Sequence, residues 1–143
     1  MTFIKKLAVV ASVACGTVGI GASLVPGTAS AAPSSALAGY NGGCGARYSV
    51  IDKFGVNDGD TGTVYLTWNN SNGYHCVVTV RDHPGSRRFM GASVRASGGT
   101  WVSTTSYYTT YAGPVYAYTR GHCVDWGGGI DTIYHKFNSH CTK

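Results

Sequence analysis

The sequence predicts an all-β fold, a small antiparallel sandwich or barrel of about seven to eight strands with two disulfides, preceded by a signal peptide. Three observations lead to this fold class. After residue 40, short runs of alternating apolar and polar residues recur between turn sequences, and no sustained helical period occurs. Val, Thr, Tyr and Trp are abundant, whereas Glu is absent from the chain. An even number of cysteines follows residue 31.

The strands expected in the first half of the chain are runs in which apolar residues occupy every second position. The clearest case has Val64, Leu66 and Trp68 on one face, with polar or aromatic residues between them. Asn72 and Gly73 then mark a hairpin turn. In chain order we expect strands at 47–51, 63–68, 74–81 and 88–96.

The second half of the chain continues this rhythm with more Ser, Thr and aromatic residues. Ala112, Gly113 and Pro114 are expected to interrupt it, because proline does not donate to a strand ladder. The three glycines at 127–129 are expected to form a flexible turn. In chain order we expect strands at 101–108, 115–120, 122–126 and 130–137.

Residues 1–31 have the three parts of a secretory signal peptide. Two lysines stand within the first six residues, residues 7–25 are uncharged and apolar or small, and an Ala-Ser-Ala site ends at Ala31. A transmembrane anchor and a lipoprotein acylated at Cys15 are the alternatives. The glycines of the apolar stretch and the small-residue site favour cleavage, either after Ala31 or at a second such site after Ala38.

Cleavage would leave a flexible leader at 32–39 and a single β domain at 40–143, without a membrane span. Nine Lys and Arg and six Asp follow residue 31, a net charge of +3 with His neutral. This excess is mild, and a nucleic-acid-binding domain usually has a concentrated basic face. We therefore expect no nucleic-acid partner.

Four cysteines follow the predicted signal peptide, and in an exported chain an even number predicts two disulfides. Three connectivities are open. We favour Cys44 with Cys76 and Cys123 with Cys141, because each pair would close a local loop. A histidine precedes three of these cysteines, but the spacing is wrong for zinc, so we expect no metal and no cofactor.

The ionisable residues form no recognisable catalytic motif. A Gly-x-Ser-x-Gly sequence is absent, and the four thiols are expected to be oxidised. Asp125 and Asp131 flank the three glycines, where turn chemistry is the ordinary explanation for aspartate. We therefore expect that the protein is not an enzyme and has no catalytic residues.

Aromatic residues are the most suggestive functional feature. Tyrosines that are exposed together could stack on sugar rings or contact another protein, although many tyrosines of β proteins lie in the core or in cross-strand pairs. The candidate binding surface comprises Tyr107, Tyr108, Tyr111, Tyr116 and Tyr118.

Several segments together resemble the spore-associated protein A family of filamentous, spore-forming actinobacteria. The resemblance runs from Tyr40 to Cys141, and its most specific part lies between residues 111 and 128. The segments that carry it are 40–45, 62–69, 72–80, 111–116, 121–128 and 138–141. The resemblance implies a small secreted protein found with spores or aerial hyphae, no defining enzymatic activity, and four cysteines that are the disulfides of the family.

Our leading hypothesis is therefore a secreted, non-enzymatic protein, extracellular or at the spore surface, whose partner is the spore or cell envelope. The alternative is a secreted binding module or inhibitor that recognises glycan or protein through the tyrosine-rich surface. A small hydrolase is a third hypothesis, which a cleft holding His and Asp together would support. The oligomeric state is left open.

Overall fold

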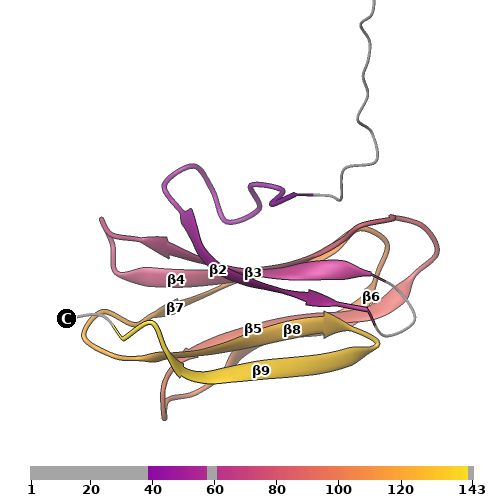
Figure 1. Cartoon of the computed structure of the whole chain (residues 1–143). Helices are drawn as coiled ribbons and strands as arrows, with labels where there is room; N and C mark the ends of the chain where they lie inside the picture. Colours follow the sequence, from indigo (N-terminus) through magenta and orange to yellow (C-terminus); the bar gives the residue numbers. More distant parts are fainter. Residues whose placement is uncertain (1–38, 58–60, 142–143) are drawn as a thin grey trace, which may run out of the picture. The chain divides into compact units, whose positions relative to one another are not determined.

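The computed structural model describes residues 39–57 and 61–141. The predicted signal peptide, both cleavage sites and the leader up to residue 38 lie outside the described residues. Within them, eight strands form two four-stranded antiparallel sheets that face each other (Figure 1). The all-β prediction is confirmed, and of the two architectures considered the protein has the sandwich.

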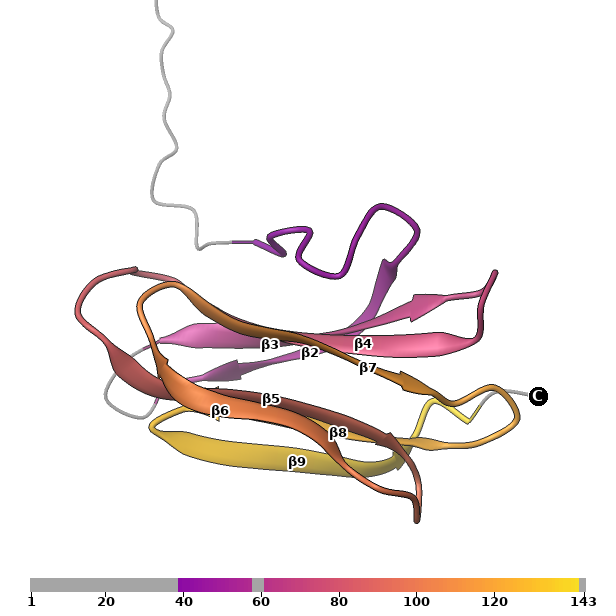
Figure 2. The same ribbon diagram turned by 180° about the vertical axis from the view of Figure 1, so that it is seen from behind.

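The chain crosses between the two sheets several times, which can be followed in the reverse view (Figure 2). The first sheet has the order β2-β3-β4-β7, formed by β2 (Ser49–Val56), β3 (Gly62–Asn69), β4 (Tyr74–Arg81) and β7 (Tyr111–Tyr118). The second sheet has the order β6-β5-β8-β9, formed by β5 (Arg88–Ala96), β6 (Val102–Tyr108), β8 (Val124–Ile130) and β9 (Thr132–Ser139). The chain therefore changes sheet after β4, β6 and β7.

Alternation along the strands directs one apolar row from each sheet into the space between them. Leu66 and Val77, which are cross-strand partners in the first sheet, face Val94 and Trp126 of the second. Trp126 is completely buried, and its ring centroid lies 5.2 Å from that of Phe54 on the edge strand β2. This interior is the main hydrophobic core.

The outer face of the first sheet carries a second, smaller core. Residues 40–48 lie over this face (Figure 1), and Cys44 packs there with Cys76 and Val78. The partly buried rings of Tyr40 and Tyr48 extend the same cluster. A segment outside the sandwich thus buries apolar surface that would otherwise face solvent.

The prediction of a flexible turn at residues 127–129 is wrong. These glycines are buried inside β8, and the chain turns after Ile130, at Asp131, which has φ 63°. The expected interruption at Ala112–Pro114 is also wrong, because β7 begins at Tyr111 and passes through it. There the pairing of β7 with β4 shifts register between Val77 and Thr79.

Contacts between the sheets explain why β8 contains glycine. Thr79 of β4 reaches across the sandwich and donates a hydrogen bond of 2.7 Å from its Oγ1 to the carbonyl of Gly91 in β5. A Cβ at Gly128 would lie 2.3 Å from that hydroxyl oxygen and 2.6 Å from the Gly91 carbonyl oxygen. The missing side chain therefore permits the bond between the sheets.

We expect Gly128→Ala to lower the free energy of unfolding by about 2–3 kcal/mol, because the added methyl must displace Thr79 or separate the sheets. Chemical denaturation measures the change. Gly55→Ala in β2 is the matched control, since a Cβ there meets only a carbonyl oxygen at 3.9 Å. Equal stability of the two variants would contradict this explanation.

Among the described residues, no helix has the length and apolar character needed to span a membrane.

Candidate functional site

The five tyrosines predicted as a binding surface do not share one face of the protein. Tyr107 lies on the outer face of the second sheet, 61% exposed, with its ring 5.8 Å from that of Phe89. Tyr111, Tyr116 and Tyr118 lie on the outer face of the first sheet.

Tyr108 points the other way, toward the main core. It packs against the core residues, and its hydroxyl is 2.7 Å from Thr104 Oγ1. The structure therefore brings three of the five tyrosines to one sheet face and separates them from the other two.

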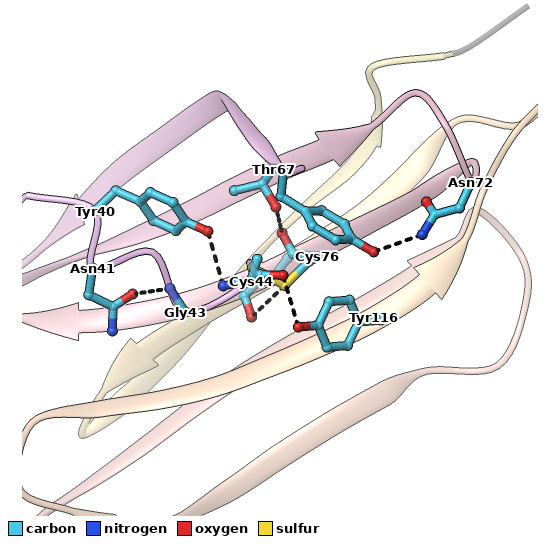
Figure 3. The surroundings of a disulfide bond; sticks show 10 residues. Tyr40, Asn41, Gly43, Cys44, Thr67, Asn72, Cys76 and Tyr116 are labelled. Carbon is cyan, nitrogen blue, oxygen red and sulfur yellow. Dashed lines mark hydrogen bonds between the residues drawn. A yellow bond between two sulfur atoms is a disulfide. The ribbon is translucent and has the colours of Figure 1, made fainter. Parts of the chain in front are cut away.

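Tyr116 has a structural partner in the segment that covers the first sheet (Figure 3). Its hydroxyl donates to the Cys44 carbonyl at 3.1 Å, while the Cys44 amide donates to the Tyr40 hydroxyl at 3.0 Å. Partial burial, with the neighbouring Tyr48 and Tyr40 phenols, raises the pKa of Tyr116. These phenols hold the segment around its disulfide.

All four cysteines that follow the predicted signal peptide are paired. Cys44 is bonded to Cys76, and Cys123 is bonded to Cys141. The favoured connectivity is therefore confirmed over the other two. The first bond attaches segment 40–48 to β4, and the second attaches the chain after β9 to the start of β8.

A cluster that the sequence did not predict lies on the outer face of the second sheet. We call Trp101, His135 and Phe137 the Trp101 cluster. The Trp101 ring centroid is 4.7 Å from that of His135 and 6.3 Å from that of Phe137, which meets it edge-on. Trp101 precedes β6, whereas the other two alternate along β9, so the cluster joins opposite edges of the sheet.

Arg95 contacts the ring of Trp101 and is itself bonded to Asp125. The Arg95 guanidinium carbon lies 4.4 Å from the Trp101 ring centroid, a cation–π geometry. Its Nε donates to Asp125 Oδ2 at 2.8 Å, and its Nη1 donates to the Gly99 carbonyl at 3.0 Å. The arginine is thus fixed between a carboxylate and a ring.

Asp125, the partner of Arg95, is buried, with 2% of its surface exposed. Its Oδ1 accepts hydrogen bonds from Ser97 Oγ and from the backbone N–H of Asn138. Burial acts to raise the pKa of Asp125, but the bonds from Ser97, Asn138 and Arg95 outweigh it and hold that pKa below its usual value. Asp125 therefore remains a carboxylate and orients Arg95.

His135 reaches across β8 to β5. Its Nε2 lies 2.9 Å from Ser93 Oγ, in hydrogen-bond contact, and a Cβ at Gly127 would lie 2.7 Å from the imidazole ring. Burial lowers the pKa of His135, the Arg95 cation lowers it further, and Asp125 opposes them. The imidazole is therefore neutral at neutral pH.

Ser93 and His135 do not form a hydrolase site with Asp125. The carboxylate oxygens of Asp125 bind Ser97, Asn138 and Arg95, so they orient the arginine rather than the imidazole. Ser93 itself lies within the sheet with only 4% of its surface exposed. This geometry lacks the accessible nucleophile and oriented base that acyl transfer needs.

Charged residues also gather at the edge of the sandwich between β2 and β9. Asp52 Oδ2 is 3.2 Å from Lys136 Nζ and 2.9 Å from His140 Nε2. Lys136 lies over the rings of Phe54 and Trp126, beside a pocket of about 290 Å³. These contacts join the two edge strands. Across the described ranges, no group of three His, Cys or Asp side chains has a geometry that could hold a metal ion.

Comparison with known proteins identifies the family. No family model matches the chain, and no solved structure matches it. The chain is 41% identical over 130 residues to spore-associated protein A of Streptomyces coelicolor. The aligned region covers 90% of this chain and 83% of that protein. The chain belongs to the spore-associated protein A family. The resemblance found in the sequence is thereby confirmed.

Membership of the spore-associated protein A family agrees with the disulfides. Such bonds form and persist in oxidising surroundings, and small exported domains use them to supplement a limited core. Two disulfides in a homologue of a spore-associated protein indicate an extracellular protein.

The Trp101 cluster was missed because Trp101 is 34 residues from His135 and 36 residues from Phe137 in the sequence. One local signal was available, since Ile133, His135 and Phe137 alternate along a predicted strand. That signal did not show which face of the strand would be exposed or that Trp101 would lie beside it.

Proposed function

We propose that this protein is secreted, has no enzymatic activity, and stays on the surface of spores or of the cells that form them through non-covalent contacts. The observation that carries this proposal is the 41% identity, across 90% of the chain, to a protein whose name records its association with spores. Export follows from the same relationship together with the two disulfides.

The polar residues that surround the Trp101 cluster support the non-enzymatic part of the proposal. Arg95, Asp125 and Ser93 are all bonded to other groups of the protein. Such bonds make a rigid surface, and rigidity of this kind lowers the entropic cost of binding. This rigidity supports a binding role.

We expect the mature protein to be recovered with washed spores of the producing strain. Detergent without wall-degrading enzyme should release it, because the contacts are non-covalent. Immunoblots of spore and medium fractions measure its distribution, and mass spectrometry of the released protein should show an N-terminus at Ala32 or Gly39. Recovery from the medium alone would contradict surface association, and an intact N-terminus would contradict cleavage.

A secreted binding module or inhibitor is the second candidate function. The observation that favours it is the exposure of Tyr111 and Tyr118 on the edge strand β7, at 42% and 53%. Tyr116 belongs to this face but holds segment 40–48, so its substitution would confuse binding with stability. A glycan array probed with the wild type and with Tyr111→Ala/Tyr118→Ala tests this candidate: equal binding would remove the tyrosines from the account.

A further inference from the structure

We infer that the Trp101 cluster is a binding site for a neutral glycan, a β-1,4-linked chain of pyranose sugars such as an envelope polysaccharide provides. This inference rests on the proposed function, since it names the partner that would hold the protein at a surface. The site lies on the second sheet, opposite the tyrosines of β7.

The exposed rings fit the apolar faces of sugars. Phe137 is 57% exposed, His135 is exposed beside it, and Trp101 is half-buried against both. Their planes are inclined to one another, at 50° for Trp101 with His135 and 76° for Trp101 with Phe137. The rings thus form a corner rather than a single plane. Sugars with equatorial substituents present flat C–H faces, which stack on aromatic rings.

The corner is held before any ligand arrives. Arg95 fixes Trp101, and Asp125 fixes Arg95 from its buried position. Ser93 fixes the imidazole of His135. Binding therefore does not need to order these side chains, a cost that weakens association at flexible surfaces.

The electrostatics of the corner favour an uncharged partner. The Arg95 cation at the corner is neutralised by Asp125, and two of its nitrogens already donate within the protein. His135 is neutral at neutral pH because burial and the Arg95 cation lower its pKa. An anionic polymer would have to give up the water around its charges without gaining an ion pair with Arg95, which is already paired with Asp125. A neutral sugar has no charge to desolvate.

Hydroxyl groups lie on the same face of the sheet. Ser103 is the cross-strand partner of Ser93, and Thr105 is that of Gly91, so both face outward from β6 and are exposed. Each hydroxyl can donate and accept hydrogen bonds, as sugar hydroxyls do. The outer face thus combines stacking surfaces with neutral hydrogen-bonding groups.

Calorimetric titration of the disulfide-bonded protein with chitohexaose and with cellohexaose tests the inference. We expect the wild type to bind at least one of these neutral β-1,4-linked hexasaccharides, and Phe137→Ala to weaken that binding about tenfold. Tyr134→Ala is the matched control, because this aromatic residue is on the same strand and is 46% exposed against 57% for Phe137, but alternates to the opposite side of β9 from His135. Binding by Tyr134→Ala should stay within about twofold of the wild type.

Thermal unfolding of each variant verifies that both fold. Binding of neither hexasaccharide at millimolar concentration would overturn the inference, as would equal weakening by the two variants. A dimer that Phe137→Ala dissociates, without glycan binding, would assign the face to a second copy of the chain and overturn it as well.

The spore fractionation separates this inference from the proposed function. If wild type and Phe137→Ala are both retained on spores and no glycan binds, surface association stands and the glycan site is wrong. If the wild type binds the hexasaccharide through Phe137 but is found only in the medium, the glycan site stands and surface association is wrong.

Discussion

Replacing Cys44 and Cys76 together by alanine is expected to lower the free energy of unfolding by about 4 kcal/mol. The bond joins residues 32 apart in the sequence, so its loss frees a long loop in the unfolded chain. In the folded protein both cysteines are buried in the second core, where Tyr40 and Tyr48 pack. Denaturation by guanidinium chloride measures the change.

The other disulfide provides the control for this prediction. Cys123→Ala with Cys141→Ala opens a loop of sequence separation 18 at the C-terminal end, for which the same model predicts about 3 kcal/mol. Segment 40–48 should stay protected from proteolysis in this control but not in the first variant. A loss below about 1 kcal/mol in the first variant would show that the bond adds little to the packing of the segment.

Acidification between about pH 6.5 and 4 is expected to lower the free energy of unfolding by about 3 kcal/mol through His75. The side chain is completely buried in the sandwich, with its ring 4.6 Å from that of Trp68. Burial, with a smaller electrostatic contribution from His140, lowers the pKa of His75 from 6.5 to about 4. Its Nδ1 contacts the Thr119 hydroxyl, and its Nε2 has no hydrogen-bond partner among the described residues.

The direction of this effect follows from proton linkage. In the unfolded chain the imidazole takes up a proton near pH 6.5, whereas in the folded protein it does so near pH 4. The unfolded state therefore binds more protons between these values, so stability is complete above pH 6.5 and falls as the pH falls. The lowered pKa of Asp125 adds a further loss, but at more acidic pH.

Denaturation curves at a series of pH values test the prediction, and two substitutions isolate its source. His75→Gln removes the titrating group, so its stability should change little between pH 6.5 and 4. His135→Gln removes an exposed imidazole, whose pKa is also lowered, and should retain most of the loss. A wild type whose stability is unchanged over this window would contradict the assignment to His75.

Local patterns in the sequence predicted the two central strands of the first sheet well, whereas the expected strands at 47–51 and 115–120 only partly overlap β2 and β7. The expected strand at 63–68 became Gly62–Asn69, and that at 74–81 became Tyr74–Arg81. Both are long alternating runs joined by a turn at Gly73, so period and turn chemistry agree. The two turns that were wrongly expected, at Gly113 and at 127–129, fall where glycine is required by contacts with other strands.

The candidate site depends on which strands pair with one another, and the sequence alone does not reveal that pairing. The five tyrosines between 107 and 118 are close in sequence, but the chain crosses between sheets after β6, and this separates Tyr107 from Tyr118. Trp101 and Phe137 are far apart in sequence, yet their rings meet over one sheet. Closeness in the sequence therefore grouped tyrosines that the fold separates, whereas the Trp101 cluster is recognisable only from the structure.

The sequence by itself determined the β class, the even cysteine count after a predicted signal peptide, the favoured disulfide pairing and the family resemblance. Each of these depends on residue type and local spacing, which a chain carries without folding. The tertiary structure alone decided that the sheets form a sandwich, that the glycines of β8 admit Thr79 and the ring of His135, and that Trp101 meets β9. These depend on which strands pair and how closely the sheets approach, because non-local contacts are created only when the chain packs.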